Sequence, residues 1–255
     1  MTVRDPRHIL ITGASSGLGE ALARAYARPG AFLALVGRNA ERLDRVGEAC
    51  RVRGATVAET AIDVAVGPEL EGWLLDIDRS HALDLVIANA GISGGTGGGE
   101  ESPEQADNII AVNVHGVVNT VTPLIPRLAA RGRGQIALMS SLASFRGFPG
   151  APTYCATKAW VRVWGEGLRV ELARKGVEVS VICPGFVDTR MTQVNQFPMP
   201  FLMTAERAAR IIVRGLARNR GRIAFPWPMY ALSWLLAAQP PALTDLVLRL
   251  APPKT

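Results

Sequence analysis

A tyrosine and a lysine stand four residues apart in Tyr154-Cys155-Ala156-Thr157-Lys158, and Ser141 precedes the tyrosine by thirteen positions. Residues i and i+4 share one face of a helix, so the lysine ammonium is expected beside the phenol. A free tyrosine has a pKa near 10. One close cation together with a positively charged cofactor ring would lower this pKa by about three units, which corresponds to roughly 4 kcal/mol. The spacing therefore predicts a phenol that gives or takes a proton near pH 7, an acid–base catalyst.

A glycine-rich turn near the start of the chain predicts a binding site for a dinucleotide. Gly13, Gly17 and Gly19 follow the apolar run 8–12 and open a helical pattern, with Ser15, Ser16 and Leu18 between them. Glycines there let the backbone approach a pyrophosphate, which then lies on the positive N-terminus of the helix. We expect these six residues to contact the cofactor.

The same turn also fits a different class of enzyme. Gly13-Ala14-Ser15-Ser16-Gly17 matches G-x-S-x-G, the nucleophile turn of serine hydrolases. That hypothesis needs an acid and a histidine later in the chain. The histidines are His8, His81 and His115, and none occurs in the last 140 residues. A hydrolase that uses Ser15 is therefore the less favoured alternative.

The residue after the second predicted strand indicates which cofactor is bound. An Asp or Glu there would accept the ribose 2′-hydroxyl of NAD, whereas Arg38 suits the 2′-phosphate of NADP. Such a charge-assisted contact is worth roughly 1.5–3 kcal/mol, about ten- to a hundredfold in affinity. We expect NADP(H) to be preferred, with NAD(H) as the alternative.

Short apolar runs alternate with amphipathic segments along the whole chain. We expect strands at 8–12, 32–37, 56–62, 83–88, 135–140, 177–183 and 222–225, and helices at about 18–28, 40–53, 67–79, 103–131, 153–175 and 204–218. Continuous apolar strands that are each followed by a helix are typical of a parallel sheet covered on both faces. The sequence predicts a single-domain α/β protein over residues 1–255 with a Rossmann-like, doubly wound sheet. The ligand is expected at the carboxyl ends of its strands.

Together these residues resemble the short-chain dehydrogenase/reductase family over residues 8 to about 190. The resemblance implies hydride transfer between a nicotinamide and a carbonyl carbon, with Tyr154 as the general acid or base. It implies that Ser141, rather than its neighbour Ser140, binds the substrate oxygen. Lys158 would hold the nicotinamide ribose, and Asn113 would keep a proton-relay water. The cofactor contacts that it further implies are Asp63, Val64, Asn89, Ala90, Gly91, Pro184, Gly185, Val187 and Thr189, in addition to Tyr154 and Lys158.

Composition narrows the partners and the location of the protein. The net charge is +6, but 25 of the 28 basic residues are arginines spread along the chain, which disfavours a nucleic-acid partner. The cysteines, Cys50, Cys155 and Cys183, are odd in number and widely spaced. They predict neither disulfides nor a zinc or other metal site, and they fit a reducing cytoplasm. No signal peptide is evident in residues 1–8. We expect a cytoplasmic protein, with a peripheral membrane location as an alternative.

The last third of the chain is expected to select the substrate. Apolar residues after Ser141 and in a lid at about 190–203 favour an apolar ketone or secondary alcohol. An apolar tail at about 223–255 is expected to pack on its own body or on a partner subunit, and contact with a membrane surface is less favoured. The family resemblance implies a homodimer or homotetramer. The prediction is an NADP-preferring oxidoreductase, and a cofactor-binding redox sensor without turnover is the alternative.

Overall fold

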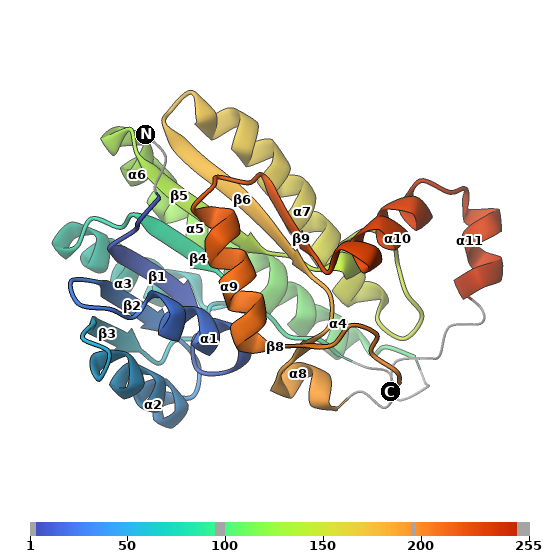
Figure 1. The fold of residues 1–255 in the computed structure, drawn as a ribbon, viewed down its shortest axis with the longest axis horizontal. Helices are drawn as coiled ribbons and strands as arrows, with labels where there is room; N and C mark the ends of the chain where they lie inside the picture. Colours follow the sequence, from blue (N-terminus) through green and yellow to red (C-terminus); the bar gives the residue numbers. More distant parts are fainter. Residues whose placement is uncertain (1–3, 95–99, 195–196, 249–255) are drawn as a thin grey trace.

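The computed structural model describes residues 4–94, 100–194 and 197–248. Its centre is a seven-stranded sheet in the order β3-β2-β1-β4-β5-β6-β9, in which every neighbouring pair is parallel (Figure 1). The strand order reverses between β1 and β4, which makes their carboxyl ends the switch point of the sheet. This confirms the predicted fold class. The strands are β1 His8–Thr12, β2 Phe32–Val36, β3 Thr56–Thr60, β4 Leu85–Ala88, β5 Gly134–Met139, β6 Val177–Pro184 and β9 Arg222–Phe225.

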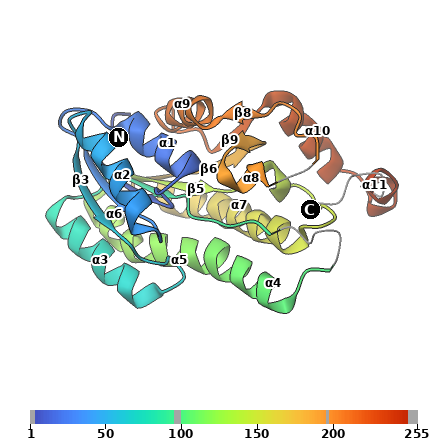
Figure 2. The same cartoon turned by 90° about the horizontal axis from the view of Figure 1, so that it is seen from below.

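Helices cover both faces of the sheet, and each face has its own hydrophobic core (Figure 2). One face carries α1 (Gly17–Tyr26), α2 (Ala40–Arg51) and α9 (Ala205–Leu216). The other carries α3 (Gly67–Ser80), the helical run Pro103–Arg131 and α7 (Pro152–Ala173). Successive strand residues belong to opposite cores: Ile9 and Ile11 pack on the α1 side and Leu10 on the α7 side.

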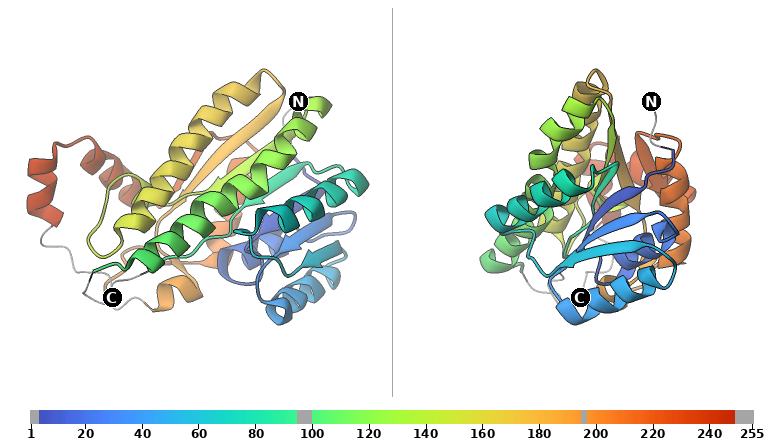
Figure 3. Two further views of the ribbon diagram at one scale, coloured as in Figure 1. Left: turned by 180° about the vertical axis from the view of Figure 1, so that it is seen from behind. Right: turned by 90° about the vertical axis from the view of Figure 1, so that its left-hand side faces the viewer.

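The helical run Pro103–Arg131 lies beside α7 on one face of the sheet (Figure 3). It is long and apolar enough to cross a membrane by length and composition, but its buried side packs in the core. Pro123 and Pro126 lack the N–H that a regular helix needs, and they interrupt the run near residues 122–124. Its parts are α4 Pro103–Ile110, a π-helical segment η1 Ala111–His115, α5 Gly116–Val121, a 3-10 turn η2 Thr122–Leu124 and α6 Ile125–Arg131.

The region after β6 contains short elements that the sequence patterns do not resolve. In the predicted lid, β7 (Val187–Asp188) pairs with β8 (Met203–Thr204), and α8 (Arg190–Gln193) lies between them in sequence. In the predicted tail, α10 (Trp227–Ala237) and α11 (Pro241–Leu248) follow β9 and extend away from the sheet (Figure 1). No residue of α10 is buried, so the tail packs on its own body only in part. Residues 195–196 and 249–255, parts of the predicted lid and tail, lie outside the described residues.

Candidate active site

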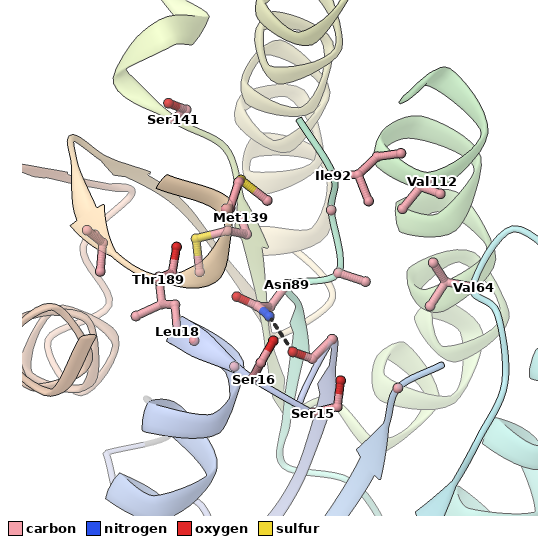
Figure 4. A pocket seen from close by; sticks show the side chains of 18 of the residues that line it. Ser15, Ser16, Leu18, Val64, Asn89, Ile92, Val112, Met139, Ser141 and Thr189 are labelled. Carbon is pink, nitrogen blue, oxygen red and sulfur yellow. Dashed lines mark hydrogen bonds between the residues drawn. The ribbon is translucent and has the colours of Figure 1, made fainter. Parts of the chain in front are cut away.

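A pocket runs along the carboxyl edge of the sheet. It is lined by every predicted catalytic and cofactor-binding residue except Asn113. Figure 4 shows Ser15, Ser16 and Leu18 on one side of this pocket, with Val64, Val112 and Ile92 opposite and Ser141 at its far end. Residues that are up to about 175 positions apart in the chain thus meet around one space, as the switch-point rule predicts.

The glycine turn between β1 and α1 has the geometry of an anion site. Gly13 and Gly17 have φ angles of +68° and +57°, which favour glycine. A Cβ on Gly19 would lie 2.1 Å from the carbonyl oxygen of Gly13, so only glycine fits there. Within the described chain, the side chain of Ser16 makes no capping hydrogen bond to α1. The first N–H groups of α1 therefore remain available for the pyrophosphate of a dinucleotide.

Hydrogen bonds join the ends of β1 and β4 beside this turn. The hydroxyl of Thr12 accepts from the backbone amides of Asn89 and Ala90, each at 3.2 Å. The side-chain amide of Asn89 donates in return to the backbone carbonyl oxygens of Thr12 at 2.9 Å and of Gly13 at 3.3 Å. Figure 4 shows Asn89 between the two strand ends. Asn89 and Ala90 thus fix the shape of the turn. Ala88, the last residue of β4, is buried in the core.

The opposite end of the pocket carries the residues expected around the adenosine. The Arg38 guanidinium lies 3.5 Å from the Asp63 carboxylate, and both side chains are partly exposed. Arg42 and Val64 line the same end. Asn39 caps α2 by accepting from the Arg42 amide at 2.8 Å, which places Arg38 at the strand end and Arg42 in the first turn of the helix. This end of the pocket therefore carries two arginines and one carboxylate.

Ser141, Tyr154 and Lys158 meet at the far end of the pocket. Ser141 hydrogen-bonds to Tyr154. The Lys158 ammonium lies 5.8 Å from the centre of the tyrosine ring and donates to the carbonyl oxygen of Met139 at 3.0 Å. The Ser140 hydroxyl donates to the backbone carbonyl of Lys158 at 2.7 Å. Ser140 therefore fastens α7 to β5, while Ser141 faces the tyrosine.

Burial dominates the acid–base properties of this group. It raises the pKa of Tyr154 to about 12, although the hydrogen bond from Ser141 acts in the opposite direction. It also lowers the pKa of Lys158 to about 8. The sequence predicts that Lys158 helps to bring the tyrosine pKa toward 7, and the protein alone does not show this effect. The reason is that the ammonium is itself desolvated and is directed to the Met139 carbonyl.

Asn113 lies in the π-helical segment, fully buried behind the pocket. Its side-chain oxygen accepts from the Ile92 amide at 2.8 Å, and its amide donates to the Ile92 carbonyl at 2.9 Å and to the Thr157 hydroxyl at 3.1 Å. A Cβ on Gly91 would lie 3.1 Å from both the Asn113 side-chain oxygen and the Lys158 nitrogen. Asn113 thus joins the loop after β4 to α7. Because Gly91 has no side chain, the side chains of Lys158 and Asn113 can approach its backbone closely.

The segment after β6 closes the remaining side of the pocket. Pro184, Gly185, Val187 and Thr189 line it, and Thr189 also caps α8 in a reciprocal pair with Thr192. Figure 4 places Thr189 opposite Ile92. These residues therefore face the same space as Ser141, Tyr154 and Lys158.

Sequence reasoning missed three residues that hold the catalytic group. Met139 and Ile92 act through their backbone, so the type of their side chains gives no signal. Thr157 could have been found, because it lies inside the tyrosine–lysine motif and is the polar residue nearest to the lysine in sequence. Its hydroxyl also donates to the Tyr154 carbonyl at 2.8 Å.

The hydrolase alternative has no base in this structure. The residues that line the pockets around Ser15 in the described chain include no histidine. His8 starts β1 at the opposite edge of the sheet, and its ring lies near that of His81. His115 is exposed. Among the described residues, no group of three or more His, Cys, Asp or Glu could hold a metal ion.

The fold and the pocket define a Rossmann-type dinucleotide-binding protein with a Ser-Tyr-Lys group at its reaction end. Residues 7–198 match the family model for short chain dehydrogenase. An uncharacterized oxidoreductase of Myxococcus xanthus (strain DK1622) is 36% identical over 95% of this chain and 96% of its own. The chain belongs to the short-chain dehydrogenase/reductase family and is an NAD(P)-dependent oxidoreductase.

Solved structures show the same architecture. A short-chain dehydrogenase from Sphingobium yanoikuyae in complex with NADPH superposes with a TM-score of 0.81, with 26% identity over 96% of this chain and 97% of its own. A short-chain dehydrogenase from Mycobacterium paratuberculosis bound to NAD gives a TM-score of 0.76, with 24% identity over 86% of this chain and 94% of its own. The similar folds thus include an NADPH complex and an NAD complex.

Proposed function

We propose that this enzyme is an NADP(H)-preferring oxidoreductase that interconverts an apolar ketone and its secondary alcohol. The observation that carries the proposal is one pocket with Ser141, Tyr154 and Lys158 at its reaction end and Arg38 at its nucleotide end. The alternative of a redox sensor without turnover does not explain why a serine, a tyrosine and a lysine converge there. A pure binder has no need of a positioned acid.

The cofactor supplies the hydride when it is bound. Tyr154 donates its proton to the oxygen of the reduced carbonyl, and Ser141 donates a hydrogen bond to that oxygen, where negative charge develops. Because the pKa of Tyr154 is about 12, the phenol is protonated near pH 7 and ready for reduction. Lys158 would hold the nicotinamide ribose. Asn113 fixes the loop at Ile92. In this proposal it would also keep a water through which Lys158 returns a proton to Tyr154.

Replacing Tyr154 by Phe tests the catalytic part of the proposal. We expect kcat to fall by about three orders of magnitude or more, because the general acid that protonates the substrate oxygen is removed. The affinity for NADPH should stay the same. Tyr26→Phe is the matched control, since Tyr26 is buried in α1 away from the pocket. Turnover that survives in Tyr154→Phe would remove the tyrosine from the mechanism.

A titration with NADPH and NADH, followed by nicotinamide fluorescence, tests the choice of cofactor. We expect NADPH to bind at least about tenfold more tightly, because Arg38 can pair with the 2′-phosphate and Arg42 lines the same end. Arg38→Ser should remove most of this ratio. Arg174→Ser, at the exposed end of α7, should keep it. A preference for NADH in the wild-type protein would contradict the assignment.

The substrate class is supported by the side chains at the reaction end of the pocket. Ile92, Met139, Val187 and Met191 line it. Arg146, which is one basic candidate for a carboxylate substrate, instead donates a hydrogen bond to Thr244 of α11. An apolar ketone is therefore favoured over an acidic one. A homodimer or homotetramer and a cytoplasmic location remain predictions.

A further inference from the structure

Exposed apolar side chains gather in two segments that flank the reaction end of the pocket. One is the described part of the lid, residues 190–194 and 197–203, and the other is the C-terminal arm, which we define as residues 226–248. Of the fifteen large apolar side chains exposed in the described chain, nine belong to these segments: Met191, Val194, Phe201, Leu202, Trp227, Leu232, Trp234, Leu235 and Leu243. Such a concentration on one part of a surface marks an interaction site.

The arm is apolar along its length and largely uncovered. No charged residue occurs between Arg222 and Asp245, and no residue of α10 is buried. Its apolar side chains lie on all sides of the helix rather than in one stripe, a pattern that belongs to helices surrounded by protein core or by lipid. The exposed Trp227 and Trp234 combine an apolar ring with a polar N–H, as side chains at the boundary between lipid and water do.

Contacts anchor the arm on the loop that carries the catalytic serine. The rings of Phe145 and Tyr230 meet edge to face at 5.6 Å, and Arg222 donates to the Tyr230 hydroxyl at 3.2 Å. Arg146, the next residue of the loop, donates to Thr244 of α11. On the other side of the pocket, Met191 of the lid is both exposed and part of the lining. Exposed apolar side chains therefore lie on both sides of the reaction end of the pocket.

We propose that the lid and the C-terminal arm dock on a phospholipid surface, from which the apolar substrate enters the pocket. A second copy of the chain that covered both segments would also close the entrance between them. A fluid lipid surface covers the same side chains and leaves a path for an apolar molecule. The delivery of substrate rests on the proposed function, whereas the docking does not.

The net charge of the whole chain favours an anionic surface, whereas the charges beside the lid and the arm balance. The chain carries a net charge of +6, and Arg190, Arg207 and Arg210 are exposed in and after the lid. Asp188, Glu206 and Asp245 are exposed in the same region, so apolar contact contributes more to docking than charge does. We therefore expect binding to neutral vesicles and tighter binding to vesicles that contain anionic lipid.

Flotation of the full-length protein with phosphatidylcholine vesicles, with and without phosphatidylglycerol, tests the docking. We expect the wild-type protein to float with both. In a variant with Trp234→Ser and Leu235→Ser, the partition coefficient should fall at least about tenfold. The control carries Val52→Ser, just after α2, and Val170→Ser, on α7; both valines are more exposed than Trp234 and Leu235, and the control should bind as the wild type does. NADPH affinity should be the same in all three proteins.

Two results would overturn the proposal. One is a wild-type protein that does not float with either vesicle. The other is an arm variant that keeps its vesicle binding but falls from an oligomer to a monomer in light scattering, which would show that a second copy covers the arm. A wild-type protein that floats but does not bind NADPH would leave the docking intact and contradict the proposed function instead.

Discussion

Lys158 is held as a cation in a place that disfavours cations. Only 3% of its surface is exposed, and its ammonium donates to the Met139 carbonyl at 3.0 Å. Burial lowers its pKa to about 8, whereas a lysine in the unfolded chain titrates near 10.4. A difference of about two units corresponds to roughly 3 kcal/mol of lost stability near pH 7. The group that supports catalysis thus lowers the stability of the fold.

Replacing Lys158 by Met should therefore stabilise the protein near pH 7 while it abolishes turnover. The folded-state pKa lies below the unfolded one, so the wild-type stability rises as the pH goes from about 8 to about 10.5. The advantage of Lys158→Met should accordingly be largest at pH 7 and fade toward pH 10.5. Thermal unfolding at both pH values measures this, with the exposed Lys175→Met as the control. A lower Tm for Lys158→Met at pH 7 would show that the hydrogen bond to Met139 outweighs the desolvation.

At the residue scale, the sequence could predict what is local along the chain. Tyr154 and Lys158 are one turn apart, so their shared face follows from helix geometry alone. Their effective pKa values could not be predicted, because burial depends on β5 and on the loop at Gly91, which are distant in the chain. The partners Met139 and Ile92 contribute only backbone atoms, and backbone atoms are the same in every residue type.

Two helical glycines differ in the space that a Cβ atom would find, and replacing each by alanine gives a matched pair of tests. A Cβ on Gly19, in α1, would lie 2.1 Å from the Gly13 oxygen and 2.7 Å from the Asn89 side-chain nitrogen. Gly19→Ala must therefore shift the phosphate turn, and we expect NADPH affinity to fall at least about tenfold. A Cβ on Gly72, in α3, meets no described atom within 4 Å. Gly72→Ala should raise stability by about 1 kcal/mol, since alanine is the better helix former.

Fluorescence titration and thermal unfolding of the two glycine variants separate the effects. Unchanged NADPH binding in Gly19→Ala would mean that the turn can move without loss of the cofactor site. A Tm that does not rise in Gly72→Ala would mean that this position is constrained by something other than its space in the helix.

At the element scale, the predicted strands and long helices are present with ends shifted by a few residues. Apolar periodicity decides such elements, and it averages over many positions. The π-helical segment at Asn113 could not be predicted, because one additional residue in a helical turn leaves the apolar pattern almost unchanged. The pairing of β7 with β8 could not be predicted either, because a strand of two residues is too short to show an alternation of apolar and polar residues.

One buried ion cluster joins two neighbouring helices on one face of the sheet. Asp78, at the end of α3, accepts from Arg127 at 2.7 Å and from Arg131 at 2.8 Å, both of α6, and from the Leu83 amide at 3.0 Å. Burial raises the pKa of this carboxyl, but the two arginines and the amide more than offset it and hold the pKa below its usual value. The folded state therefore favours the carboxylate.

Asp78→Asn should destabilise the protein by about 3 kcal/mol at pH 7, because it leaves two arginines without their anion. The folded-state pKa lies below the unfolded one, so the contribution of Asp78 is present above about pH 4 and is lost as the pH falls through the folded value. The difference between wild type and variant should therefore narrow in acid. Denaturant unfolding at pH 7 and pH 3 measures this. Asp76→Asn, on the exposed side of α3, should change stability by less than about 1 kcal/mol.

At the scale of the whole molecule, the sequence predicts a doubly wound sheet, and the structure adds the order of its strands. It also shows how little of the C-terminal arm is covered. Apolar composition alone favours packing of that segment, and only the path of the chain after β9 shows that α10 buries none of its residues. The partner that covers the arm cannot be predicted from the composition of the arm itself.

The reversal of strand order at β1 and β4 has a consequence for how this enzyme can diversify. The nucleotide end is built by residues up to Val64, on β1, β2, β3 and the turns that follow them. The entrance for the substrate is built by residues after Met139, in the serine loop, the lid and the arm. Mutation or recombination in the second half of the gene can therefore change which alcohol is oxidised without altering the nucleotide that is consumed. Enzymes that descend from one ancestral chain can in this way keep the same nicotinamide cofactor while they acquire new substrates.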